Sequence, residues 1–195
     1  MTQVYDDPSI DPMKVIRPSR YPGLDYIAAD LSLARGEELL KADVSTPQQF
    51  RLKTLLDNVR NNYDVCLIDC SPSLSLLNVN ALVASDYVYV PTRPDDGSLE
   101  GVAMTYNLVK EVQTYSLGLK MGGIFFTAYN SKEAAYREAE KLLGHFLPSA
   151  LMPQHIGVTT FIKKMGMEQK MLAELSPKHR VTREYRELTD TMLQA

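Results

Sequence analysis

The sequence predicts an α/β fold, a doubly wound and mostly parallel sheet with helices on both faces. Apolar runs of strand length alternate along the chain with segments whose apolar residues recur at helical spacing. Strands that alternate with helices form parallel sheets joined by right-handed crossovers. The length of 195 residues, with 45% hydrophobic and 23% charged residues, suits one globular core.

We expect a single α/β domain over residues 1–195. Residues 1–22 contain four prolines and little periodicity, so they are predicted to be an extended lead-in. The strands are expected in five apolar runs, at residues 23–29, 63–69, 86–91, 121–129 and 150–153.

The segments between these runs are predicted to be helices. In each, apolar residues fall three and four positions apart, which places them on one helical face. These helices are expected at residues 47–60, 76–83, 99–109 and 135–146, with two more near the C-terminus.

Charge and hydropathy narrow the classes of function. The net charge is -3 and the pI about 5.6, so no global positive field attracts nucleic acid or anionic lipid, and such binding requires a local patch. No apolar run approaches the ~20 residues that span a bilayer. Cys66 and Cys70 are expected to be buried, reduced thiols. We therefore expect a cytoplasmic protein, associated with the nucleoid if it binds DNA.

Polar residues follow several of the predicted strands. These polar breaks are residues 69–73, 92–98, 127–131 and 153–155. Ligands of open α/β sheets bind outside the carboxyl ends of the strands. The breaks are therefore expected to meet at one edge of the sheet and form a site there.

Asp69 ends the apolar run at residues 63–69 and is the strongest candidate for chemistry. A carboxylate in that position suits Mg²⁺, which takes one or two carboxylates together with water and phosphate oxygens. The alternative is that Asp69 only accepts hydrogen bonds from the amides of the following turn. The residues by themselves leave both roles open.

The stretch YDVCLIDCSPSLSLLNVNALVASDYVYVPTRPDDGSLEGV, residues 63–102, resembles the second acidic motif of ParA/Soj-type partition ATPases. These proteins are MinD-like P-loop NTPases with a deviant Walker A loop. Weaker similarity covers residues 15–40 and the run GGIFFTAYN. The resemblance implies a P-loop NTPase-like sheet and an ATPase that acts in plasmid or chromosome partitioning.

The resemblance also implies roles for individual residues. Asp69 matches the Walker B acid, a catalytic residue that assists Mg²⁺ coordination. Residues matching the switch that responds to the γ-phosphate are Cys70, Ser71, Pro72 and Ser73, and those matching segments near the nucleotide base are Thr127, Asn130 and Pro153. Ser71 replaces the usual first proline of the switch, and Gln154 stands where an arginine is common.

The phosphate loop of that family has no counterpart in this chain. No Gly-Lys-Thr or Gly-Lys-Ser occurs in the sequence. The chain is therefore expected to match the C-terminal two-thirds of the family fold, without the first strand. ATP and Mg²⁺ are cofactors of the complete family member. This chain alone is expected not to hydrolyse ATP well, because the charge stabilisation of phosphoryl transfer is missing.

Basic residues near the C-terminus are candidates for DNA contacts, which the resemblance implies to be independent of DNA sequence. They are Lys163, Lys164, Arg183 and Arg186. The alternative is a solvated helix face, because glutamates alternate with them. The last helix is expected to pack on the core and not on a membrane, because the charge of its polar face is mixed.

Two hypotheses follow from the sequence. The first is a partition ATPase that dimerises with nucleotide, binds DNA and responds to a ParB-like partner. The second is a nonenzymatic interaction module that pairs with another chain. An oligomer is expected under both, because a missing first strand would expose apolar strand edges.

Overall fold

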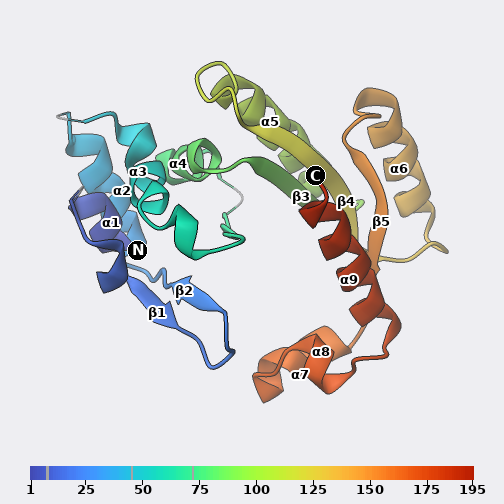
Figure 1. The fold of residues 1–195 in the computed structure, drawn as a ribbon. Coiled ribbons are helices and arrows are strands. Elements are labelled where there is room, and N and C mark those ends of the chain that lie inside the picture. Colours follow the sequence, from blue (N-terminus) through green and yellow to red (C-terminus); the bar gives the residue numbers. More distant parts are fainter. Residues whose placement is uncertain (8, 45, 72) are drawn as a thin grey trace. The chain divides into compact units, whose positions relative to one another are not determined.

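The computed structural model describes the whole chain except residues 8, 45 and 72 and the side chain of Asp96. It divides into two compact units (Figure 1). Unit 1 comprises Met1–Asp86 and Lys110–Leu119, and unit 2 comprises Tyr87–Val109 and Lys120–Ala195. Each unit is described by itself.

The centre of unit 2 is a parallel three-stranded sheet in the order β3-β4-β5. Its strands are β3 (Tyr87–Thr92), β4 (Lys120–Tyr129) and β5 (Leu151–Gly157). Side chains of β4 alternate between the two faces, as the period of a strand requires. Ile124 and Phe126 enter one apolar cluster, and Phe125 enters the other.

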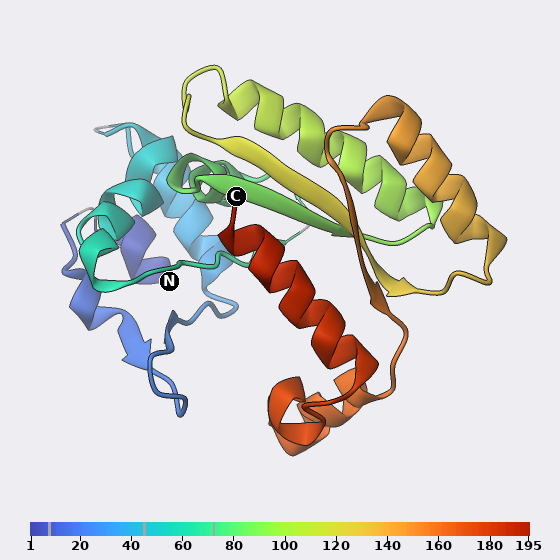
Figure 2. The same ribbon diagram turned by 45° about the vertical axis from the view of Figure 1, so that its right-hand side comes forward.

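Helices cover both faces of this sheet, as Figure 2 shows. On the face of Phe126 lie α5 (Asp96–Val112) and α6 (Ala134–Phe146). On the face of Phe125 lie α8 (Leu172–Leu175) and α9 (Arg180–Leu193), preceded by α7 (Phe161–Glu168). The predicted α/β class, with a parallel sheet between helices, is confirmed.

Unit 1 is mainly helical. Its helices are α1 (Thr2–Asp6), α2 (Leu33–Ala42), α3 (Arg51–Asp57) and α4 (Leu76–Ala84), with 3₁₀ turns η1 (Pro12–Lys14), η2 (Gln48–Phe50) and η3 (Arg60–Asn62). Leu52 and Leu55 of α3 and Ala81 of α4 form its core together with Val4 and Val15. No helix within the described part of the chain is long and apolar enough to cross a bilayer.

The N-terminal residues differ from the predicted extended lead-in. Residues 1–22 contain α1, η1 and the short strand β1 (Ile16–Pro18). Burial explains the difference, because Val4 and Tyr5 are only 1% and 3% exposed. Burial also raises the pKa of Tyr5 to about 12. The predicted strand at residues 23–29 is present as β2 (Asp25–Ile27), but it pairs antiparallel with β1 outside the parallel sheet.

The prediction of a buried strand at residues 63–69 is wrong for this structure. The segment is assigned to no strand and belongs to neither of the two described sheets. Val65 and Leu67 are 60% and 90% exposed, and Cys66 and Cys70 are exposed rather than buried. A β-strand needs a hydrogen-bonded neighbour, and no described strand pairs with this segment.

Candidate functional site

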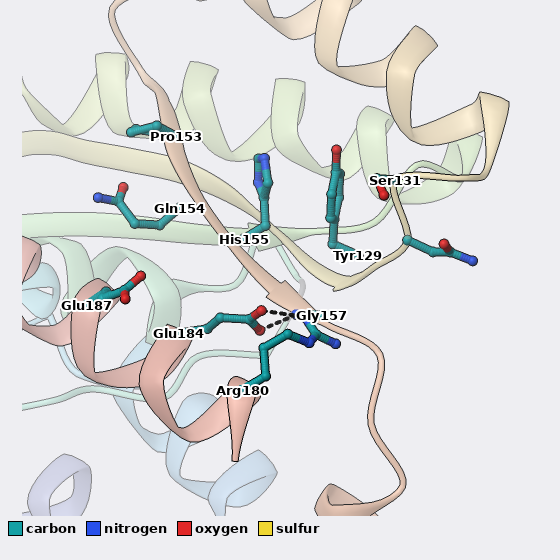
Figure 3. Close-up of a pocket in the computed structure, with 10 residues that line it drawn as sticks. Tyr129, Ser131, Pro153, Gln154, His155, Gly157, Arg180, Glu184 and Glu187 are labelled. Atoms are coloured by element: carbon teal, nitrogen blue, oxygen red, sulfur yellow. Dashed lines mark hydrogen bonds and ion pairs between the residues drawn. The ribbon is translucent and has the colours of Figure 1, made fainter. Parts of the chain in front are cut away.

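A polar cavity of about 650 Å³ lies in unit 2, beside the C-terminal end of β4 and along β5 (Figure 3). Helix α9 supplies its other wall. The residues that line it are Tyr129, Asn130, Ser131, Pro153, Gln154, His155, Gly157, Arg180, Glu184 and Glu187. Most of these side chains carry hydrogen-bonding groups, so the cavity suits a polar ligand.

Two stacked aromatic rings stand on the sheet at this cavity. The centroids of Tyr129 and His155 are 4.1 Å apart with an interplanar angle of 24°. Phe126 lies beneath them, with its ring centroid 6.1 Å from that of His155. The buried Phe126 ring therefore supports the cavity wall from the core side.

The end of β4 has an unusual backbone conformation. Ala128 has φ 51°, which is rare for a residue with a side chain. The Tyr136 hydroxyl donates hydrogen bonds to the carbonyls of Ala128 at 2.6 Å and Thr127 at 3.1 Å. Burial raises the pKa of Tyr136, which favours its neutral, hydrogen-bond-donating form. Helix α6 thus fixes the turn that carries Tyr129 and Asn130 into the cavity.

Two buried polar atoms of the cavity residues have no hydrogen-bond partner among the described residues. They are Gln154 Oε1 and His155 Nδ1. The other polar atom of each side chain is engaged: Gln154 Nε2 donates to Thr191 Oγ1 at 3.0 Å, and His155 Nε2 lies 3.3 Å from Glu140 Oε1. With the proton of His155 on Nε2, its Nδ1 is an acceptor. Gln154 and His155 are neighbours on β5, so their side chains leave opposite faces of the strand, Gln154 toward Thr191 of α9 and His155 toward Glu140 of α6.

Charged residues of α9 hold the end of β5. Glu184 accepts a hydrogen bond from the backbone N–H of Gly157 at 2.8 Å and pairs with Arg180 one turn earlier. A Cβ atom at position 157 would collide with the Arg180 guanidinium. A larger residue at position 157 would therefore displace the Arg180 guanidinium, which is the end of a flexible and partly exposed side chain.

The three predicted base-site residues have different positions. Asn130 and Pro153 line the cavity. Thr127 lies outside its lining, and its hydroxyl donates to the Thr92 carbonyl at 3.2 Å, which links β4 to β3. Pro153 lies within β5, since that strand continues to Gly157. The polar break predicted after residue 152 is thus part of a strand.

Asp69 and the predicted switch lie in unit 1. Asp69 is exposed and accepts no hydrogen bond from a described residue, so the proposed contact with amides of the following turn is not formed there. Partial desolvation, and then the charge of Asp69, raise the pKa of the Cys70 thiol. Among the described residues, no three His, Cys, Asp or Glu side chains gather in a group that could hold a metal ion. Asp69 is therefore a single carboxylate.

One side chain organises the switch segment. Asn78 Nδ2 donates to the Ser71 carbonyl at 2.7 Å and also to the Ser73 carbonyl. The hydroxyls of Ser71 and Ser73 lie 3.0 Å apart. Pro72, also predicted to belong to the switch, lies outside the described residues.

The four predicted DNA contacts are exposed in unit 2. Lys163 and Arg183 make no ion pair with the described residues. Lys164 pairs with Glu168 at 3.4 Å, and Arg186 donates to the Pro177 carbonyl at 3.2 Å. Lys163 and Arg183 are thus the cations most available to a phosphate.

Several cavity residues were not predicted individually. Tyr129, Ser131 and His155 fall within predicted polar breaks, so the breaks indicated the region but not the residues, and Gln154 was noted only as standing where an arginine is common. Arg180, Glu184 and Glu187 come from a helix far along the chain. Their i, i+4 spacing predicts a surface ion pair, and nothing in it indicates contact with Gly157.

Comparisons with known proteins agree with this architecture. The model of a family described as an AAA domain matches residues 4–121. The sporulation initiation inhibitor protein Soj of Bacillus subtilis is 37% identical over 123 residues, 63% of this chain and 48% of Soj. The chromosome partitioning protein ParA of Caulobacter vibrioides is 31% identical over 145 residues, 71% of this chain and 54% of ParA. The chain thus spans about half the length of these relatives.

A solved structure shows the same fold over nearly the whole chain. Apo McdA from Cyanothece superimposes with a TM-score of 0.87 at 15% identity, over 98% of this chain and 76% of McdA. The matching family model covers more than half of the residues, and the ParA relative is a chromosome partitioning protein. The chain belongs to the ParA/Soj-type partition ATPase family of P-loop NTPases.

Proposed function

We propose that this chain acts in DNA partitioning or positioning as part of an ATPase of the ParA/Soj type, and that its unit 2 cavity takes the base of an adenine nucleotide. Family membership supports the first part of this proposal. The unpaired acceptors Gln154 Oε1 and His155 Nδ1 support the second. The exocyclic amino group of adenine is a donor that matches one such acceptor, since the two acceptors lie on opposite faces of β5 and do not bind one amino group together.

The assignment rests on the free-energy cost of leaving these buried acceptors without a hydrogen bond. A buried acceptor without a partner costs about 1–3 kcal/mol, and a ligand that donates to it recovers part of that energy. The exposed ring of Pro153 adds an apolar surface for a planar base, and Asn130 adds an amide at the rim. A cavity of about 650 Å³ accommodates a nucleoside.

The phosphates of the nucleotide have no comparable site in this chain. The sequence has no Gly-Lys-Thr or Gly-Lys-Ser, so it has no loop of the family's type in which backbone amides and a lysine surround the phosphates. A phosphate-binding loop must then come from outside these residues. When Mg²⁺–ATP is bound to such a complete site, the metal neutralises charge on the phosphates, and Asp69 is the carboxylate that we assign to it.

Equilibrium binding of adenosine and of ADP tests the base site. We expect the two ligands to bind the 195-residue chain with affinities within about threefold of each other, with or without Mg²⁺, because only the base is recognised. Replacing Gln154 by alanine should weaken both by about five- to tenfold, the effect of one hydrogen bond of ~1 kcal/mol. Isothermal titration calorimetry measures the affinities of the unchanged chain and of the variant for both ligands.

The control for this measurement is Gln194→Ala, which removes an exposed glutamine at the end of α9 in the same unit and should leave both affinities unchanged. ADP that bound a hundredfold more tightly than adenosine in the presence of Mg²⁺ would show that a phosphate site exists in the chain. That result would contradict the proposal, as would steady release of phosphate from ATP by the chain alone.

Nonspecific DNA binding is the second property that we propose, with Lys163 and Arg183 as the phosphate contacts. Each phosphate contact that is lost should reduce the slope of log affinity against log salt concentration by about 1. We therefore expect Lys163→Ala and Arg183→Ala each to lower that slope equally on two unrelated DNA duplexes, measured by fluorescence anisotropy.

The matched control for the DNA measurement is Lys141→Ala, an exposed lysine of α6. For Lys141→Ala, the slope of log affinity against log salt concentration should equal that of the unchanged protein. If all three substitutions reduced the slope equally, binding would be a diffuse charge effect and the assigned contacts would be wrong. In the complete protein we propose that nucleotide closes a dimer that binds DNA, and that a ParB-like partner stimulates hydrolysis.

The rival function is an interaction module that works by pairing with another chain and does not use nucleotide. The exposed apolar segment at residues 63–70 favours it. The two functions differ in the calorimetric experiment, because only the first requires that adenosine binding depend on Gln154.

A further inference from the structure

An apolar groove lies between α7, α8 and α9 of unit 2, and we propose that it binds an amphipathic helix of a partner protein, with a carboxylate of that helix on Arg186. The groove has a volume of about 260 Å³. It is separate from the nucleotide cavity, since the two share no lining residue. Binding there requires neither nucleotide nor DNA, so it goes beyond the proposed function.

The groove follows one face of α9, where α7 and α8 approach that helix (Figure 1). Four residues of α9 that line it recur at i, i+3, i+4 and i+7, which places them on one side of the helix. They are Thr182, Tyr185, Arg186 and Thr189. Leu193, four positions after Thr189, continues this face and is 62% exposed.

The surface of the groove is mainly apolar. Thr182 Oγ1 donates to the Ser176 carbonyl at 2.6 Å, and Thr189 Oγ1 donates to the Tyr185 carbonyl at 2.8 Å, so both hydroxyls are satisfied within the protein. On the opposite wall, Ile162 of α7 lines the groove and is 44% exposed. Free energy is gained when a partner covers apolar surface of this kind.

Two polar groups of the groove are still available, and both can donate hydrogen bonds. Arg186 is exposed and forms no ion pair within the described part of the chain, not even with Asp190 one turn later. Only Nη1 of its guanidinium is engaged, by the Pro177 carbonyl at 3.2 Å. The Tyr185 hydroxyl has no hydrogen-bond partner among the described residues, and burial raises the pKa of Tyr185, which keeps that hydroxyl a neutral donor. A carboxylate matches such a pair of donors.

The geometry favours a helix over a strand as the occupant. Backbone groups of α7 and α9 bond within these helices, so the groove presents no row of free N–H and C=O groups to an added strand. From Thr182 to Leu193, the face of α9 is about 16 Å long, at about 1.5 Å per residue. This length is three helical turns, which matches an amphipathic helix with anchors at i, i+4 and i+7.

Charge disfavours two other occupants. Glu187 and Asp190 are exposed on α9, whereas helices that lie in a membrane interface carry mainly lysine and arginine on their polar face. In a two-fold contact between two copies of this chain, the same patch faces itself, which would place two Arg186 guanidinium groups in one apolar interface. A helix of another protein that carries carboxylates avoids this repulsion.

Fluorescence anisotropy with a labelled helical peptide tests the proposal on the full chain. The probe is the acetylated, amidated peptide Ala-Glu-Leu-Ala-Gln-Glu-Leu-Ala-Gln-Leu-Glu-Ala, which has leucine at i, i+4 and i+7. We expect it to bind with a dissociation constant below a millimolar. The same peptide with lysine in place of all three glutamates should bind about tenfold more weakly, because it sets like charges beside Arg186.

Charge reversal on the protein identifies the contact. Arg186→Glu should invert the preference, so that the lysine peptide binds about tenfold more tightly than the glutamate peptide. Binding of the lysine peptide also shows that this variant keeps the groove, although it loses the bond to the Pro177 carbonyl. Lys178→Gln removes an exposed cation outside the groove lining and should leave the preference for the glutamate peptide unchanged.

Two substitutions on α7 test the apolar part of the contact. Ile162→Ser should weaken binding of both peptides about fivefold. Met167→Ser should leave both affinities unchanged, since Met167 is 86% exposed, lies outside the lining and follows Ile162 by five positions, on another side of α7. Circular dichroism checks that both variants fold.

Four results would overturn the proposal. The first two are the absence of binding by either peptide at millimolar concentration and equal binding of the two peptides to the unchanged chain. The third is cosedimentation with phosphatidylglycerol vesicles that Ile162→Ser abolishes, which would identify a lipid surface as the occupant. The fourth is a dimer of the unchanged chain that Ile162→Ser dissociates, which would identify a second copy.

Discussion

Replacement of Phe126 by alanine should lower the free energy of unfolding of unit 2 by about 3–5 kcal/mol, the usual cost of truncating a buried phenylalanine. Phe126 is fully buried and contacts the cluster that joins α5 and α6 to β4. Its ring also lies edge-on to Tyr136, with centroids 5.8 Å apart. Urea unfolding followed by circular dichroism measures the loss.

The matched control is Phe146→Ala, since Phe146 lies at the end of α6 and is 69% exposed. Its effect should stay below about 0.5 kcal/mol, as for most surface substitutions. Phe126→Ala should also weaken adenosine binding, because Phe126 supports His155. If both alanine variants unfolded at the same urea concentration, the core assignment of unit 2 would be wrong.

The second large effect is expected at Asn80, whose substitution by alanine should destabilise unit 1 by about 2–4 kcal/mol. Asn80 is fully buried in α4. Its Oδ1 accepts from the N–H of Leu52 at 3.2 Å, and its Nδ2 donates to the carbonyls of Gln48 and Leu76, each at 3.0 Å. Alanine leaves the N–H of Leu52 and the carbonyl of Gln48 without this partner.

Asn61→Ala serves as the control for Asn80, because Asn61 is exposed in η3 of the same unit. Hydrogen exchange of the α3 and α4 amides distinguishes the two variants. Faster exchange in α3 and α4 is expected only for Asn80→Ala. Unchanged exchange there would mean that Asn80 does not join these helices.

The sequence predicts unit 2 well because its elements are specified locally. The runs at 86–91 and 121–129 are apolar and bounded by polar residues, and they form β3 and β4 with shifts of one residue at most. The run at 150–153 is found too, but β5 extends to Gly157. Gln154 and His155 are polar, so they interrupt the apolar run from which a buried strand is predicted.

The run at residues 63–69 shows what a local pattern leaves undetermined. Its composition is that of a buried strand, yet strand formation depends on a neighbour, and none of the described strands pairs with it. The residues that line the cavity likewise depend on contacts between segments that are distant in the sequence. Asn130 and Pro153 follow from the family resemblance, whereas Arg180 and Glu184 reach Gly157 only through the packing of α9 on β5.

The most direct test of the account is a ¹⁵N NMR spectrum of the histidine side chains with and without adenosine. Binding of the base in the cavity should shift the ring nitrogen resonances of His155, which lines it, and the resonances of His145 and His179, which lie outside the cavity lining, should stay in place. Adenosine that bound without moving the His155 resonance, or that moved all three histidines equally, would contradict the assignment of the base to this cavity.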